Sequence, residues 1–383
     1  MSAPSSPAPT RPLQFRDVPR GQALQARLGR LVHDLGRPLS VMHVCGSHEQ
    51  AIARYGLRPS FPPDLHVQMG PGCPVCVTDT TDIDAVLALA ESGVTVLTYG
   101  DMLAVPGSRQ SLREARAAGA HVEVIYAATQ AIDIARSRRD PVVFFATGFE
   151  TTAVATAAIL LRDPPPNLLV YSAHKWVPAA MEIVASLPHS KIEGFLAAGH
   201  AATITGHAIF DPFVAKHGRP VVIAGFEPLD ILAGLVCLVE CIRDRRREVV
   251  NAFPRCVTRD GNQRALAALY RVFQMGSGPW RGIADIPGGE LSLRPEFAAH
   301  DARIHFADRL HAAAQPPQES EREACRCGAI MTGTAQPSDC PLFGQGCRPD
   351  APVGACMVSS EGPCRIWFDS GQVRRSSQAE SAR

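Results

Sequence analysis

Short apolar runs alternate with stretches of helical spacing through the middle of the chain. Eight of the apolar runs predict strands: Leu39–Cys45, Leu65–Met69, Thr95–Tyr99, His121–Tyr126, Val142–Thr147, Leu168–Ser172, Phe195–Ala198 and Val221–Ala224. Predicted helices lie between them, for example Asp82–Ser92, Ala128–Ala135, Thr151–Leu161 and Val177–Ser186. This alternation is typical of βαβ units with parallel sheets, so the expected fold class is α/β.

Eight strands favour two small α/β domains over one, and the polar stretch Arg136–Asp140 is a plausible seam between them. A helix is predicted near Gln22–Leu35 and a long one near Leu229–Ala252. Beyond it, Pro and Gly become frequent, which indicates a separate C-terminal domain. The predicted organisation is a disordered tail (1–20), α/β domain I (21–139), α/β domain II (140–253), a cysteine-rich domain (254–371) and a second tail (372–383).

Composition excludes several classes of function. Hydrophobic residues make up 46% of the 383 residues, and 38 Lys and Arg balance 37 Asp and Glu. This balance gives no basic field for nucleic acid or for an anionic membrane surface. The N-terminus lacks the apolar core of a signal peptide, and the apolar stretch Leu229–Ile242 is too short to cross a bilayer. We therefore expect a cytoplasmic protein with neither nucleic-acid nor membrane partners.

Twelve cysteines without a secretion signal favour metal binding or redox chemistry over a disulfide framework. Six of them fall within 40 residues: Cys325, Cys327, Cys340, Cys347, Cys356 and Cys364. Thiolates bind both iron–sulfur clusters and zinc. The absence of a C-x₂-C pair in this group counts against a common zinc ribbon, although a Cys₄ zinc site remains the alternative.

Cys73 and Cys76 form a C-x₂-C pair whose turn is set by Gly72 and Pro74, just ahead of a predicted helix. Thiols at a helix N-terminus have depressed pKa values, which favours a redox dithiol. Half of a metal site is one alternative, and a pair of inert core thiols is another.

Cys45 ends the first predicted strand. Ser47 and Gln50 match a capping box, so a helix is expected to begin just after Cys45. That position predicts a low-pKa thiol near His48 that can bind a metal, and a buried inert thiol is the alternative. By contrast, Cys237 and Cys241 share one face of an apolar helix, and with Cys256 they are predicted to pack in a core.

Several predicted strands end in small-residue turns that carry a polar or thiol group. In parallel α/β sheets, ligands bind outside the carboxyl ends of strands, so a cleft between two domains could collect these groups. The alternative is that the glycines close βα turns and the polar residues cap helices. The turns are Cys45–Glu49, Gly70–Cys76, Tyr99–Asp101, Gly148–Thr152, Gly199–His200 and Gly225–Pro228.

Six motifs in order resemble those of the HypD family of [NiFe]-hydrogenase maturation factors: Cys45–Glu49, Gly70–Cys76, Gly148–Thr152, Gly225–Asp230, Asp339–Gly344 and Gly354–Gly362. The resemblance runs from about residue 22 to residue 369. One position departs from it, because the family usually carries a second histidine where this chain has Gln50. A ligand role is therefore not carried over to Gln50.

The resemblance implies two α/β domains and a C-terminal domain with a [4Fe–4S] cluster. The family's cluster pattern, C-x₁₄-C-x₆-C-x₁₆-C, falls here on Cys325, Cys340, Cys347 and Cys364. Cys327 and Cys356 then match a thiol pair beside the cluster.

The resemblance also implies partners and a cargo. With a small HypC-type protein, the family holds an iron ion while the iron acquires cyanide and carbon monoxide. HypE, with HypF, supplies the cyanide, and the iron unit passes to the hydrogenase large subunit.

On this basis Cys45 is expected to anchor the iron. Electrons are expected to pass from the cluster and Cys327/Cys356 to Cys73/Cys76 by thiol–disulfide exchange. The cleft would supply proton transfer or hydrogen bonds from His48, Asp101, Glu150, His200 and Glu227. Two other functions remain open: a cluster-dependent thiol–disulfide oxidoreductase without bound iron, and a zinc-stabilised binding module.

Overall fold

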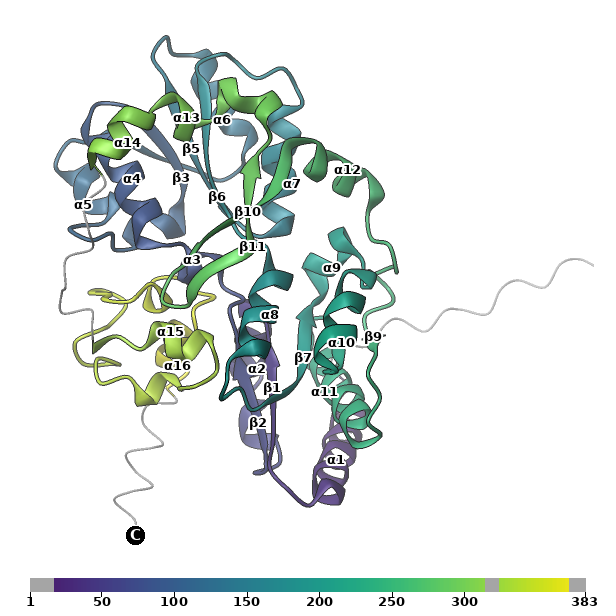
Figure 1. Cartoon of the computed structure of the whole chain (residues 1–383). Helices are drawn as coiled ribbons and strands as arrows, with labels where there is room; N and C mark the ends of the chain where they lie inside the picture. The colour runs from purple at the N-terminus through teal and green to yellow at the C-terminus, as the bar shows by residue number, and fades with distance from the viewer. Residues whose placement is uncertain (1–16, 314–323, 372–383) are drawn as a thin grey trace, which may run out of the picture.

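The computed structural model describes residues 17–313 and 324–371, and it confirms the α/β class (Figure 1). The predicted tails lie largely outside these residues. Val18–Arg20 belong to the first helix, so the prediction of a disordered tail to residue 20 is wrong at its end. The N-cap side chain of Asp17 accepts a hydrogen bond from the Arg20 amide at 3.0 Å, which is why the helix begins here.

One sheet, drawn in the lower half of Figure 1, has five parallel strands in the order β2-β1-β7-β8-β9. Its strands are β1 (Leu39–His43), β2 (Leu65–Met69), β7 (Ile192–Ala198), β8 (Val221–Ala224) and β9 (Val249–Asn251). One face packs on α1 (Val18–Leu35), α2 (Gly46–Arg54) and α11 (Pro228–Arg243). The other face packs on α8 (Val177–Ser186) and α10 (Asp211–His217). Both faces are therefore buried, as the continuous apolar strands require.

A second sheet, drawn in the upper half, has four parallel strands in the order β4-β3-β5-β6. Its strands are β3 (Thr95–Tyr99), β4 (Val122–Ile125), β5 (Val142–Gly148) and β6 (Leu168–His174). One face packs on α6 (Thr129–Arg136) and α7 (Glu150–Leu160), the other on α4 (Thr80–Glu91) and α5 (Leu112–Ala117). All seven residues of β5 and of β6 are buried.

The predicted seam at Arg136–Asp140 does not separate the sheets. β3 pairs with β5 across it, with Val96 opposite Val143. The chain instead leaves the five-stranded sheet after β2, builds the whole four-stranded sheet, and returns at β7. The predicted division into residues 21–139 and 140–253 is therefore wrong, because apolar alternation locates strands but carries no information on which strands pair.

The segment after β9 also divides differently from the prediction. A helix, an antiparallel hairpin and two short helices return to the four-stranded sheet. These are α12 (Gln263–Val272), β10 (Phe273–Trp280), β11 (Ala284–Leu293), α13 (Ala302–His305) and α14 (Ala307–Ala313). Within the predicted domain 254–371, the cysteine-rich part is thus confined to residues 324–371, with α15 (Cys327–Met331), η7 (Ala355–Met357) and α16 (Pro363–Asp369).

The long helix predicted to Ala252 ends at Arg243. Arg245 has a left-handed φ of 55°, which breaks the helix, and Val249–Asn251 then form edge strand β9. The apolar pattern continues through the break, so periodicity alone did not reveal it.

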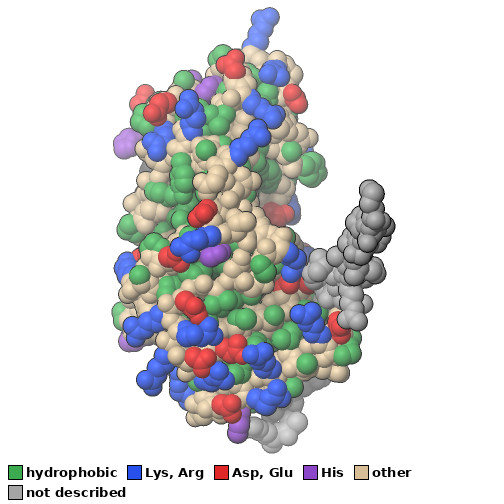
Figure 2. Space-filling model, turned by 90° about the vertical axis from the view of Figure 1, so that its right-hand side faces the viewer, with side chains coloured by type: hydrophobic (Ala, Val, Ile, Leu, Met, Phe, Trp, Pro, Cys, Tyr) green, Lys and Arg blue, Asp and Glu red, His purple; other side chains and the backbone are tan. Residues whose placement is uncertain are grey.

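Among the described residues no helix is long and apolar enough to cross a membrane. On the face seen in Figure 2, Lys and Arg side chains are interspersed with Asp and Glu, especially over the lower half. This agrees with the nearly neutral composition.

Phe144, on inner strand β5, is fully buried, whereas Tyr126, just after β4, is 86% exposed. We expect Phe144→Ala to lower the free energy of unfolding by about 3–5 kcal/mol, because it leaves a cavity in a sheet packed on both faces. Tyr126→Ala, the matched control, should stay within about 0.5 kcal/mol. Urea denaturation measures both, and equal losses would contradict this description of the core.

Candidate thiol site

Cys45 lies at the carboxyl edge of the five-stranded sheet, beside residues that follow β7 and β8. Its Sγ is 3.9 Å from Nδ1 of His200. The Phe226 ring lies between two imidazoles, 5.0 Å from that of His48 and 5.2 Å from that of His200. Parallel strands end at one edge, so three turns far apart in sequence meet here, as the strand-end argument predicted.

The prediction that Cys45 is a low-pKa thiol is wrong. The side chain is 2% exposed, and burial raises the pKa of the Cys45 thiol to about 12. Amide hydrogen bonds from Ser47 and His48 at the start of α2 lower the pKa, as expected at a helix N-terminus, but burial outweighs them. The sequence predicts that a helix begins after Cys45, but it does not reveal how deeply the Cys45 thiol is buried.

Both histidines near Cys45 are held neutral. Burial lowers the pKa of His48 to about 3, and burial also lowers the pKa of His200. His48 Nε2 faces the carbonyl oxygens of Ala224 and Gly225 at 3.3 and 3.1 Å. His48 therefore ties α2 to the end of β8, and it is His200 that faces the thiol.

Cys73 and Cys76 form a disulfide at the start of the short helix α3 (Pro74–Val77). Its loop approaches Cys45 directly: Gly46 N donates to Gly72 O at 2.9 Å, and a Cβ on Gly72 would lie 2.2 Å from Cys45 N. Only glycine fits at this position. The structure thus brings together the two cysteine motifs that the sequence presented separately.

The C-terminal loop Ser359–Glu361 connects the ends of the two sheets. Ser359 Oγ donates to Asp101 at 3.2 Å, after β3, and Ser47 Oγ donates to Glu361 at 3.1 Å, at the start of α2. Burial raises the pKa of Glu361, whose charge in turn acts on Cys45. Glu361 was not among the predicted site residues, although its motif was recognised.

Gln50 donates to the Ser360 carbonyl at 2.7 Å. Gln50, which stands where the family usually carries a second histidine, therefore binds the C-terminal loop Ser359–Glu361.

A buried ionic network that the sequence analysis missed lies behind Cys45. His43 contacts the Cys45 carbonyl through Nδ1 at 3.1 Å and Glu49 through Nε2 at 2.8 Å. Glu49 also accepts from Arg58 at 2.6 Å and from the Trp367 indole at 3.0 Å. Although burial opposes it, the charge of Arg58 and the hydrogen bond from His43 lower the pKa of Glu49 to about 2. One carboxylate thus joins β1, α2 and α16.

Glu150, in the first turn of α7, is 1% exposed. It accepts a hydrogen bond from the Val177 amide at 2.9 Å. Its second oxygen has no hydrogen-bond partner among the described residues, and burial raises the pKa of Glu150 to about 7. The hydrogen bond of Glu150 therefore goes to the start of α8 (Val177–Ser186) and not to Cys45.

A cavity of about 750 Å³ opens over the carboxyl ends of β3, β4 and β5, between the disulfide loop and α7. Asp101, Pro74 and Val75 are among its lining residues. Glu227 lines a different cavity of about 760 Å³ with Ser47 and Gln50, and it caps α11 through Asp230. Asp101 and Glu227, both predicted to line one cleft, therefore line different cavities. Strand ends show which residues lie at an edge of a sheet, but side chains decide which cavity each residue lines.

Five of the six C-terminal cysteines form one thiol group. Cys325 Sγ and Cys327 Sγ are 3.4 Å apart, and both lie against Gly354. Hydrogen bonds from Cys327 and Cys356 lower the pKa of Cys364, and Cys325 and Cys347 lie close enough to oppose this effect. Cys340, also buried, has its Sγ 4.0 Å from the carbonyl oxygen of Ala324, the residue before Cys325.

This donor set fits a [4Fe–4S] cluster in its chemistry. It offers soft thiol ligands in a largely buried setting, and four thiolates each bind a different iron of such a cluster. Among residues 17–313 and 324–371, no three His, Cys, Asp or Glu side chains are already grouped around one point for a single ion.

η7 carries Cys356 and packs against α3, which carries Cys76. The C-terminal thiols are therefore adjacent to the disulfide, and the disulfide loop is adjacent to Cys45. The other cysteines lie apart: Cys241 is buried and Cys237 partly buried, as predicted, but Cys256 is exposed, so the prediction of core packing is wrong there.

Comparisons with known proteins show the family to which the chain belongs. A family model described as HypD, hydrogenase formation hypA family, matches residues 21–371. Hydrogenase maturation factor HypD of Azotobacter vinelandii is 41% identical over 374 residues, covering 94% of this chain and 97% of that protein. The HypD of Rhizobium leguminosarum bv. viciae is 40% identical, covering 97% and 98%. A putative hydrogenase expression/formation protein of Methanocaldococcus jannaschii is 38% identical, covering 86% and 91%. The chain therefore belongs to the HypD family.

Proposed function

We propose that this chain is a cytoplasmic scaffold of hydrogenase maturation that holds an iron ion at Cys45 while the iron acquires cyanide and carbon monoxide. The observation that carries the proposal is the continuous series of thiols. The C-terminal group packs on α3 through η7, and the loop of α3 packs on the Cys45 backbone. Relatives named hydrogenase maturation factors support the process in which this series would act.

In this proposal a [4Fe–4S] cluster is held by Cys325, Cys340, Cys347 and Cys364 and supplies reducing electrons when bound. Cys327 and Cys356 lie beside it. Cys73 and Cys76 alternate between the disulfide and the dithiol, and the contact of η7 with α3 supports exchange between the two pairs.

Cys45 supplies a soft thiolate to the iron cargo, and a HypC-type partner supplies a second. His200 is a neutral neighbour of that thiol, with its Nδ1 3.9 Å from Sγ. HypE, with HypF, would deliver the cyanide. The completed unit would pass to the hydrogenase large subunit.

A second candidate function is that of a thiol–disulfide oxidoreductase without bound iron. The Cys73–Cys76 disulfide favours it. The seclusion of Cys45 beside His200 favours the scaffold, because an oxidoreductase has no use for a third thiol held next to a buried imidazole.

Cys347→Ala should bleach the protein. We expect anaerobically purified wild-type protein to be brown with about four irons, and this variant to lose colour and iron, because one corner of the cluster loses its thiolate. Cys256→Ala, which removes an exposed thiol, is the matched control and should stay brown. Colourless wild-type protein with stoichiometric zinc would contradict the cluster.

Cys45→Ala should separate the cargo from the cluster. Co-purified with its small partner, the variant should keep the visible absorption of the cluster and lose the one additional iron, because its thiol is apart from the C-terminal group. Metal analysis alongside absorption measures both. Retention of the additional iron would place the cargo elsewhere, and loss of the cluster would show that the two sites are not separate.

Glu150→Gln should change stability in a pH-dependent way. The pKa of Glu150 is raised from 4.5 to about 7, so wild-type protein loses stability as pH rises through this window, because the unfolded chain ionises first. Gln does not ionise, so the variant does not lose this stability as pH rises. Relative to wild type it should gain up to about 3 kcal/mol by pH 8 and nothing at pH 4. Denaturation at both pH values measures the gain, with Glu182→Gln as an exposed control, and parallel profiles would contradict the raised pKa.

A further inference from the structure

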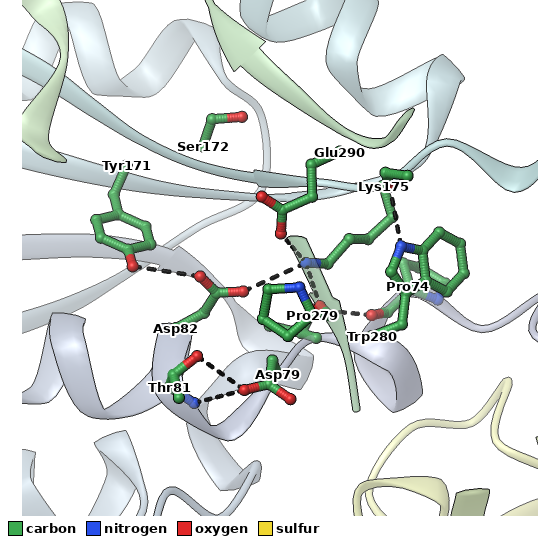
Figure 3. A network of polar contacts seen from close by, with 12 residues as sticks. Pro74, Asp79, Thr81, Asp82, Tyr171, Ser172, Lys175, Pro279, Trp280 and Glu290 are labelled. Carbon is green, nitrogen blue, oxygen red and sulfur yellow. Dashed lines mark hydrogen bonds and ion pairs between the residues drawn. The ribbon is translucent and has the colours of Figure 1, made fainter. Parts of the chain in front are cut away.

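Lys175, the residue after β6, is fully buried, which is unusual for a lysine. Its ammonium forms ion pairs with Glu290 on β11 and, at 3.4 Å, with Asp82 in the first turn of α4. It also donates to the Pro279 carbonyl on β10 at 2.8 Å. Figure 3 shows the ammonium between Asp82, Glu290 and Pro279.

The charges of this network balance. Arg303 donates to Asp82 at 2.7 Å, so two cations face two carboxylates, and the Tyr171 hydroxyl donates to Asp82 at 3.2 Å. Burying such groups costs free energy that apolar side chains of the same volume would not, so stability alone does not explain the network. Its best-attested use in proteins is to fix one arrangement of the segments that it joins.

The segments joined here hold the disulfide helix. Trp280, next to Pro279, forms an antiparallel bridge with Thr78, the residue that ends α3. Arg281 N donates to Val77 O at 3.0 Å. The Trp280 indole, 1% exposed, donates to Gly289 O at 3.0 Å across the hairpin. The β10–β11 hairpin thus forms backbone contacts with the C-terminal end of α3. Lys175 connects both strands of the hairpin to the four-stranded sheet, through Pro279 on β10 and Glu290 on β11.

We propose that Lys175 is a positioning residue for the Cys73–Cys76 pair. By fixing the hairpin, it keeps α3 in the conformation in which the two sulfurs are within bonding reach. A disulfide forms only in a narrow geometry, so a helix ordered in advance favours the bond over the open dithiol. The inference rests on the proposed role of this pair as a redox dithiol.

The reaction tested is the exchange of this disulfide with glutathione. Two glutathione thiols reduce the Cys73–Cys76 bond, leaving a dithiol on the protein and one glutathione disulfide, so two electrons and two protons pass to the protein. The full-length protein is equilibrated anaerobically in glutathione buffers, quenched in acid and alkylated under denaturing conditions. Mass spectrometry of the peptide that contains both cysteines then gives the equilibrium constant.

The test variant is Lys175→Met with Glu290→Gln, which removes one charge of each sign and leaves Asp82 paired with Arg303. We expect its equilibrium constant to shift at least fivefold toward the dithiol, about 20 mV for a two-electron couple. Glu290→Gln alone, a milder change, should shift the constant in the same direction by a smaller factor.

Two controls isolate the hairpin connection. Tyr171→Phe removes a hydrogen bond of the same network that does not reach the hairpin. Lys216→Met with Glu182→Gln repeats the chemistry on an exposed ion pair. Both should leave the constant unchanged.

The proposal would be overturned if Lys175→Met/Glu290→Gln or Glu290→Gln alone folds and keeps the wild-type equilibrium constant with glutathione. An equal shift of this constant in Tyr171→Phe would also overturn it, because the network would then contribute only to general stability. The proposed function fails by a different result, namely normal hydrogenase maturation by a Cys73→Ser/Cys76→Ser variant.

Discussion

The loop before Cys73 approaches the backbone of Cys45 so closely that no side chain fits between them. A Cβ on Gly72 would lie 2.2 Å from both the Cys45 nitrogen and the Val44 carbonyl carbon. The backbones that follow β1 and β2 are therefore in direct contact. This contact fixes the position of the Cys73–Cys76 disulfide relative to the Cys45 thiol. The C-terminal loop contacts the residues that follow Cys45, through Glu361 and Ser47.

Two buried charge networks hold the elements around this contact. The network on Glu49 joins the strand before Cys45 to α16, the helix that carries Cys364. The network on Lys175 joins the four-stranded sheet to the hairpin beside α3. Each network therefore holds a different element near the cysteines: the Glu49 network holds α16, and the Lys175 network holds the hairpin that packs on α3. Such networks are costly to bury, and their positions at the thiol elements indicate that they serve geometry more than stability.

Much of this could be predicted from the sequence. Apolar alternation located eight of the nine parallel strands, and the strand-end turns of Cys45 and His200 were both among the six expected at a cleft. Pairing could not be predicted, because β3 joins β5 and β1 joins β7 through contacts that no local pattern records. Depth of burial was also hidden. Burial reverses the expected pKa of Cys45 and raises the pKa of Glu150, and the sequence gives no sign that Lys175 is buried.

We propose that Cys45 holds an iron ion that carries cyanide and carbon monoxide. Infrared spectroscopy of the anaerobically purified complex with the small partner tests it most directly, since protein has no strong bands where metal-bound cyanide and carbonyl absorb. We expect bands of both ligands, and we expect a ¹³C-labelled cyanide precursor to shift the cyanide bands alone. A complex that supports hydrogenase maturation and shows neither set of bands would contradict the account and favour the oxidoreductase without bound iron.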